Sequence, residues 1–140
     1  PRILQQLVET SVENCYLFDR EFEHGDEPVK IALQDGRMVE FRKQLADDLS
    51  FDMLGESVGF FRFGAEQAEA IARECGRFDR EGLGDAPHEE ALRNVLLRQP
   101  ERYGLEDITG LPWIEIDFPG DVRRAAEEVL PAIRLDYADF

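Results

Sequence analysis

The residue best suited to chemistry in this sequence is Asp117, which lies between an alternating apolar segment and a proline. Side chains alternate between the two faces of a strand, so the pattern over 113–118 predicts a short strand with Asp117 near its C-terminal end. Ligands of open α/β sheets bind at that end, and proteins commonly hold Mg²⁺ with one or two carboxylates plus substrate phosphates. Asp117 is therefore a candidate Mg²⁺ ligand. The alternative is that Asp117 only caps a helix beginning near Pro119, because Asp is a favoured N-cap and Pro a favoured first helical residue.

The chain has only two lysines, Lys30 and Lys43, against fourteen arginines, and both flank a predicted hairpin. A compact ammonium group suits a phosphate as a point charge, so both lysines are candidates for phosphate contacts. The alternative is that both are ordinary solvated lysines on the hairpin strands.

Four segments, in this order along the chain, carry a resemblance to a known family. They are DEPVK at 26–30 before the turn QDGR at 34–37, VEFRK at 39–43, GESVGFFRF at 55–63, and WIEIDFPGD at 113–121 with the helix VRRAAEEVLP at 122–131. Together they span most of residues 1–134. They resemble the C-terminal half of the sugar-nucleotidyltransferase-like family, in its phosphocholine or inositol-phosphate cytidylyltransferase branch.

The resemblance implies an α/β fold over residues 1–140, with a partial mixed sheet and flanking helices as in the C-terminal half of a Rossmann-like (GT-A-like) nucleotidyltransferase domain. It implies a Mg²⁺-dependent reaction that joins a nucleoside triphosphate, expected to be CTP, to a phosphorylated small alcohol or sugar with release of pyrophosphate. Asp117 would be the metal ligand, Lys30 and Glu56 catalytic residues, with Glu56 on the acceptor side, and Lys43 a contact of the nucleotide phosphates. The alternative for Glu56 is a charge that discourages pairing at a strand edge.

Two features of the resembling family are missing from the sequence. The family has a glycine-rich nucleotide loop after its first strand and an acidic pair at the end of a central strand. No glycine-rich phosphate loop occurs here, since the eleven glycines are scattered singly or in turns. We therefore expect this chain to be the C-terminal half of the domain, to be inactive alone, and to form a homodimer or associate with the missing N-terminal half. The rival hypothesis is a non-catalytic acidic α/β interaction or regulatory domain.

Two aromatic residues are candidates to complete an acceptor site. Trp113 and Tyr103 would form an aromatic wall for a quaternary ammonium head group, which cation–π attraction would hold. The alternative for Trp113 is a place in the core, because tryptophan is highly buried on average.

Hydrophobic periodicity and turn signals predict the elements that must position these residues. They predict helices over 2–10, 64–78, 88–98 and 120–134, and strands over 14–22, 29–33, 37–41, 57–63 and 113–118. The helix over 64–78 would carry Ala68, Ile71, Ala72 and Cys75 on one apolar face. Because strands alternate with helices after an antiparallel hairpin, we expect a mixed α/β sheet with strands 57–63 and 113–118 at its centre.

The composition limits the partners of the chain. A net charge of −15 argues against binding to nucleic acid or to an anionic membrane, although metal ions can bridge an acidic protein to a nucleotide. No apolar run approaches transmembrane length and no signal peptide is visible, so the cytoplasm is the expected compartment. Cys15 is expected to be a small core residue, and the sequence does not decide whether it pairs with Cys75.

Overall fold

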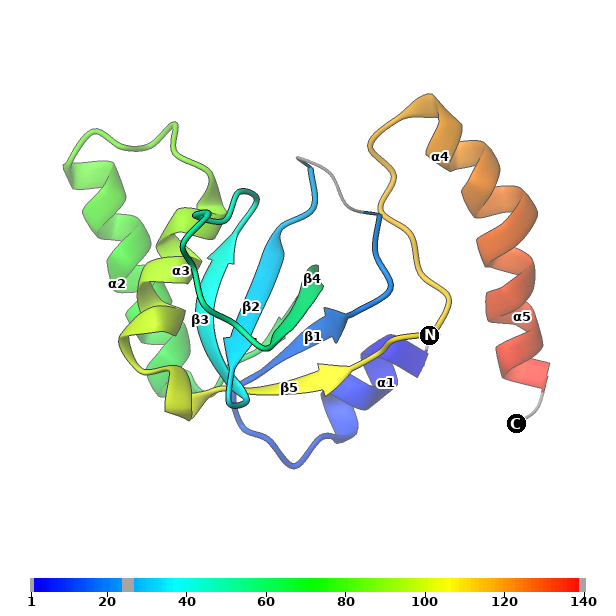
Figure 1. Ribbon diagram of the computed structural model, residues 1–140, viewed down its shortest axis with the longest axis horizontal. Coiled ribbons are helices and arrows are strands. Elements are labelled where there is room, and N and C mark those ends of the chain that lie inside the picture. The colour runs from blue at the N-terminus through cyan, green and yellow to red at the C-terminus, as the bar shows by residue number, and fades with distance from the viewer. Residues whose placement is uncertain (1, 24–26, 139–140) are drawn as a thin grey trace.

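A five-stranded mixed sheet forms the centre of the computed structural model, which describes residues 2–23 and 27–138 (Figure 1). Its strands are β1 (Cys15–Asp19), β2 (Lys30–Gln34), β3 (Arg37–Arg42), β4 (Met53–Arg62) and β5 (Gly104–Asp107). They lie in the order β3-β2-β4-β1-β5, with β1 parallel to β5 and every other pairing antiparallel. The fold is thus mixed α/β, as the sequence predicts, and β4 is the central strand.

Helices lie on both faces of this sheet. On one face lies α1 (Arg2–Glu9), while α3 (His88–Arg98) packs against the other face and α2 (Ala65–Arg80) packs on α3. A 3₁₀ turn, η1 (Pro100–Arg102), precedes β5. The last helix consists of α4 (Pro119–Arg124), a π-helical turn, η2 (Ala125–Val129), and α5 (Leu130–Ala138), and it stands to one side of the sheet (Figure 1). No helix in the described ranges has both the length and the apolar character needed to cross a membrane.

The β2–β3 hairpin is specified locally by Asp35 and Gly36. Both residues have positive φ, 51° and 73°, as a two-residue type I′ turn requires, and an Asp-Gly pair tolerates this conformation. The turn sets the register that pairs Lys30 with Arg42 at the open end of the hairpin. Lys43 follows directly, so the hairpin brings the two lysines of the chain to the same end of the sheet.

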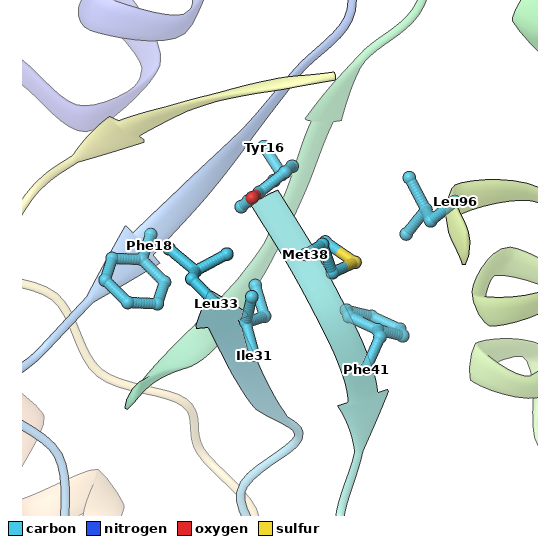
Figure 2. Close-up of a cluster of buried hydrophobic side chains, with 7 residues drawn as sticks. All are labelled: Tyr16, Phe18, Ile31, Leu33, Met38, Phe41 and Leu96. Atoms are coloured by element: carbon cyan, nitrogen blue, oxygen red, sulfur yellow. The ribbon is translucent and has the colours of Figure 1, made fainter. Parts of the chain in front are cut away.

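The core lies on both faces of the sheet, and β1 contributes to both. On the α3 side, Figure 2 shows the cluster of Tyr16, Phe18, Ile31, Leu33, Met38, Phe41 and Leu96. On the α1 side, Ile3 and Leu7 pack with Cys15, Leu17, Val58 and Ile108. All five residues of β1 are buried, which explains its continuous apolar run.

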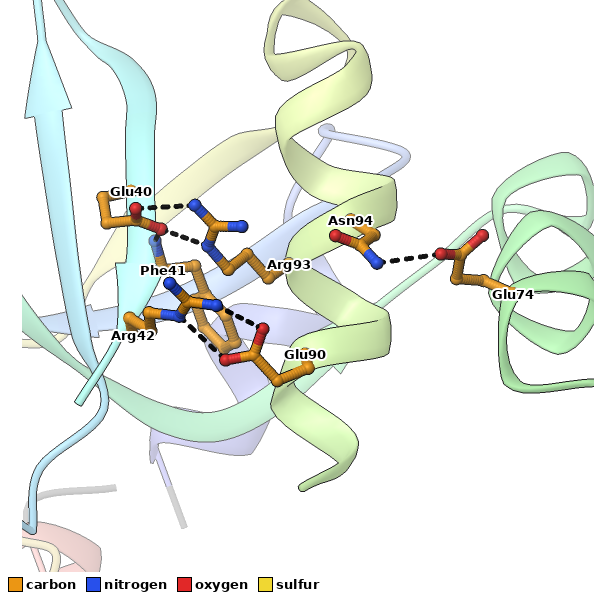
Figure 3. A network of polar contacts seen from close by, with 7 residues as sticks. All are labelled: Glu40, Phe41, Arg42, Glu74, Glu90, Arg93 and Asn94. Carbon is orange, nitrogen blue, oxygen red and sulfur yellow. Dashed lines mark hydrogen bonds and ion pairs between the residues drawn. The ribbon is translucent and has the colours of Figure 1, made fainter. Parts of the chain in front are cut away.

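Charged side chains fix α3 against β3 and α2. Arg93 pairs with Glu40, and Arg42 pairs with Glu90, so two ion pairs cross from the strand to the helix (Figure 3). On the opposite side of α3, Asn94 donates a hydrogen bond to Glu74 of α2. The helix itself begins and ends where the sequence predicts, and it buries Ala91, Val95 and Leu96 among its inward residues.

Two predictions about the sheet are wrong. Residues 113–118 are not a strand and pair with no neighbour among the described elements. Instead β5, which lies between the predicted helix 88–98 and the predicted strand 113–118, pairs with β1. After Ile108 the chain turns at Gly110, where φ is 84°, and leaves the sheet. The alternation over 113–118 exists in the sequence, but Ile116 and Phe118 are 56% and 60% exposed, so it has no buried face.

The two cysteines do not form a disulfide. Cys15 is a buried free thiol in the sheet, as expected, and Cys75 is an exposed free thiol on α2.

Candidate functional site

A cleft of about 690 Å³ opens between the end of β1 and the segment that leads to α4. Eight acidic side chains line it, against two arginines. The acidic residues are Asp19, Glu21, Glu23, Glu27, Glu56, Glu115, Asp117 and Asp121. We call this pocket the acidic cleft. Such a concentration of like charge favours a cationic or metal-bridged ligand over a bare anion.

Glu56 occupies the middle of a row of charged residues across three strands. Strand pairing sets Glu56 opposite Lys30 of β2 on one side and opposite Asp19 of β1 on the other. Burial above all, together with the charges of Glu115 and Asp19, raises the pKa of Glu56 to about 7 against the opposing charge of Lys30. The carboxyl group therefore changes its charge near neutral pH, which is the range useful for proton transfer.

This pKa predicts the effect of Glu56→Gln on stability. Since the folded-state pKa of Glu56 lies above the usual 4.5, its stabilising contribution is complete below pH 4.5 and is lost as the pH rises through 7. We expect the wild-type free energy of unfolding to fall by about 1 kcal/mol more than that of Glu56→Gln between pH 5 and pH 8, with the full shift discounted because the side chain is only half-buried. Urea denaturation at both pH values measures this.

The matched control for that measurement is Glu128→Gln, which removes the charge of an exposed carboxylate on the C-terminal helix. Its pH dependence should follow the wild type. If Glu56→Gln also follows the wild type over this range, Glu56 does not titrate near neutrality in the folded protein.

Lys30, at one end of this row, contacts Lys43. Lys30 Nζ donates a hydrogen bond to the backbone oxygen of Lys43 at 2.5 Å, and Lys43 Nζ pairs with Glu27 at 3.0 Å. The hydrogen bond to Glu27 raises the pKa of Lys43, and the charges of Glu89 and Asp117 add to this effect. Lys43 lines a smaller pocket of about 210 Å³, which shares Glu27, Glu115 and Asp117 with the acidic cleft.

Asp117 is not the cap of the following helix. The carboxylate of Asp121 accepts hydrogen bonds from the backbone N–H groups of Asp117 and Phe118, at 3.2 and 2.8 Å, and so satisfies the start of α4. Asp117 itself is exposed and lines both pockets. It stands on an unpaired extended segment and not at a strand end, and within the described residues its carboxylate accepts no hydrogen bond.

The structure thus brings Lys30, Lys43, Glu56 and Asp117 to one end of the sheet. No group of three or more His, Cys, Asp or Glu side chains placed to hold a metal ion occurs within residues 2–23 and 27–138. Mg²⁺ needs only one or two protein carboxylates when substrate phosphates supply the other oxygens. One exposed carboxylate, such as that of Asp117, is enough for that mode of binding.

The structure adds one residue to the site and separates two others. Asp19 was not predicted, although a single carboxylate closing an apolar strand is a signal that could have identified it. It accepts a hydrogen bond from Trp113 Nε1 at 2.6 Å. Trp113 packs with the α1-side core and Tyr103 with the α3-side core, where it lies edge-on to Phe63. The predicted aromatic wall of Trp113 and Tyr103 is therefore wrong, because the sheet lies between them.

Comparison with known proteins gives no relative: no family model matches the chain, and no curated protein matches it. Function is therefore inferred from the residues of the site and their geometry.

Proposed function

We propose that this chain is the C-terminal part of a Mg²⁺-dependent nucleotidyltransferase with a Rossmann-like, GT-A-like domain. The enzyme joins a nucleoside triphosphate, expected to be CTP, to a phosphorylated small alcohol or sugar and releases pyrophosphate. The observation that carries this proposal is that Lys43 and Asp117, from distant parts of the sequence, line one pocket beside the acidic cleft, with Lys30 bonded to the backbone of Lys43. Glu56 lines the acidic cleft, which shares Asp117 with that pocket, and it faces Lys30 across the strand pairing.

The protein contributes little covalent chemistry to this reaction. A phosphate oxygen of the acceptor attacks the α-phosphorus of the triphosphate, a new P–O bond forms, and the bond to the bridging oxygen breaks as pyrophosphate leaves. Catalysis of this kind consists mainly of positioning the reactants and stabilising negative charge. Lys30 and Lys43 supply positive charge, and Asp117 would hold Mg²⁺, which neutralises charge on the phosphates when it is bound.

The acidic side chains of the cleft define the acceptor side of this site. Glu56 is close to its pKa at neutral pH and can remain protonated beside a phosphate, which avoids repulsion. The remaining carboxylates favour an acceptor that carries a positive group as well as its phosphate. Trp113 lines the same cleft and offers an aromatic surface to such a group.

Exposed apolar side chains support association with a nucleotide-binding half. Large apolar residues with substantial exposure occur on β4 and on the segment around α4, and they include Met53, Phe60, Ile116, Phe118 and Val122. Contiguous exposed apolar surface is typical of sites that a partner covers, and association with the nucleotide-binding half would cover such side chains.

The 140-residue chain alone is expected to show no turnover, because it has no phosphate-binding glycine loop. An assay of pyrophosphate release with CTP, Mg²⁺ and a panel of phosphorylated alcohols and sugars measures this. Clear turnover by the isolated chain would contradict the requirement for a second half.

The proposal as a whole is tested by joining the chain to its nucleotide-binding half and repeating the assay. The expected result is Mg²⁺-dependent pyrophosphate release with at least one acceptor. In parallel, Mn²⁺ binding to the isolated chain, followed by electron paramagnetic resonance, should weaken on Asp117→Asn but not on Asp121→Asn. Absence of turnover in the joined protein, together with equal Mn²⁺ binding by both variants, would favour the non-catalytic interaction domain instead.

A further inference from the structure

The segment from Gly110 to Phe118 carries Asp117 but has no strand partner to hold it. Its predecessor β5 is fixed by parallel pairing with β1, and the backbone N–H of Ile108 still bonds the oxygen of Phe18 at 2.9 Å. Beyond that point, the hydrogen bonds of residues 117 and 118 are made to Asp121, within the same segment. Something else must therefore place Asp117 relative to the sheet.

Asp19 and Trp113 make the connection between this segment and the sheet. Asp19 is the last residue of β1 and is only 5% exposed. One of its oxygens accepts the indole N–H of Trp113 at 2.6 Å, and the other accepts the backbone N–H of Glu21 at 2.9 Å. A buried carboxylate is costly unless it is well hydrogen-bonded, and here both oxygens have a donor. Further along, an exposed ion pair of 3.4 Å joins Arg124 to Glu23.

We propose that Asp19 is a positioning residue, which holds the segment 110–118 against the sheet through the Trp113 indole and so determines where Asp117 stands. The consequence for metal binding rests on the proposed function, whereas the hydrogen bond itself does not. The geometry also explains why a carboxylate is needed. Both carboxylate oxygens of Asp19 accept a hydrogen bond from an N–H donor. An asparagine side chain has one acceptor oxygen, so it could accept only one of the two hydrogen bonds.

Trp113 is the only tryptophan of the chain, so its fluorescence reports on this contact directly. We expect Asp19→Ala to increase the quenching of Trp113 by acrylamide about threefold and to shift its emission to the red, with Asp19→Asn intermediate. The matched control is Glu23→Ala, which removes an exposed carboxylate of the same cleft and should leave the quenching unchanged. Equal quenching in Asp19→Ala and Glu23→Ala would show that packing alone holds Trp113 and would overturn the proposal.

A second variant keeps the test decisive if Asp19→Ala fails to fold. Trp113→Phe retains an aromatic ring but removes the N–H donor together with part of the ring surface that packs on the core. In hydrogen exchange, the amides of residues 110–118 should exchange at least fivefold faster in this variant, while those of β1 and β4 are unchanged. Wild-type exchange over 110–118 would overturn the proposal.

Mn²⁺ binding separates this inference from the proposed function. If both are right, Asp19→Ala weakens Mn²⁺ binding about fivefold, because Asp117 is no longer held in place. If the wild-type chain binds no Mn²⁺ but the quenching and exchange results hold, the positioning role of Asp19 stands and the metal site at Asp117 does not.

Discussion

Replacing Asp117 by asparagine is expected to lower kcat of the joined enzyme at least about a hundredfold, the effect typical of losing one charge-stabilising group at such a site. Asparagine preserves the size of the side chain and removes the charge that would bind Mg²⁺. The thermal midpoint should change little, because Asp117 is exposed and Asp121, not Asp117, accepts the hydrogen bonds at the start of α4. Both quantities are to be measured on the same preparation.

The matched control is Asp121→Asn, which removes a carboxylate four residues away in the same cleft. It should show the reverse pattern, with a lower thermal midpoint through weaker capping, by about 1 kcal/mol, and a kcat within a few-fold of the wild type. If kcat of Asp117→Asn falls less than about tenfold, or falls only in step with unfolding, the assignment of Asp117 as a metal ligand is wrong.

Glu74→Ala is expected to give the largest loss of stability. Glu74 is 4% exposed and accepts hydrogen bonds from Arg77, Asn94 and Arg98, at 2.7, 2.9 and 3.0 Å. Removing it leaves three donors without their acceptor between α2 and α3. Breaking a buried charged network costs several kcal/mol, and because both arginines are partly exposed we expect about 2–3 kcal/mol. Urea denaturation at pH 7 measures the loss.

The pH dependence of this loss identifies its cause. The hydrogen bonds from Arg77, Asn94 and Arg98 lower the pKa of Glu74 from 4.5 to about 2, against the opposing effect of burial. The stabilising contribution is therefore complete above pH 4.5 and disappears as the pH falls towards 2, so wild type and Glu74→Ala should converge in acid. Glu69→Ala is the control, because its ion pair with Arg73 is exposed and should contribute less than about 0.5 kcal/mol. Equal losses in the two variants would refute the role of Glu74.

Local signals predicted most of the fold. The Asp35-Gly36 turn, the continuous apolar run of β1 and the periodicity of α3 each depend on residues close in the sequence, and the structure confirms all three. The interior of α2 was predicted less well. Its apolar residues Ala72 and Cys75 are exposed, while Gln67 and Glu74 are buried. The hydrophobic pattern does not predict the buried face of α2, because that face is set by polar contacts of Glu74. The partners of Glu74 are Arg77 on α2 and Asn94 and Arg98 on α3.

The candidate site was predicted in part for the same reason. Residue type identified the two scarce lysines and Asp117, and the structure places them near one cleft. The strand assigned to 113–118 is wrong, because alternation alone does not provide a neighbouring strand to pair with. Asp19 escaped prediction because its partner Trp113 is 94 residues away in sequence.

The order of strands in the sheet also has a consequence for how the site forms during folding. The β2–β3 hairpin closes the short loop between Lys30 and Arg42, whereas β1 meets β5 only when Cys15 reaches Gly104. The longer closure costs about 2 kcal/mol more in chain entropy. Lys30 and Lys43 are therefore expected to be placed early, within a unit that folds locally, and Asp117 late, once β1 and β5 have paired. Any event that opens the β1–β5 pairing would release Asp117 and leave the two lysines in place.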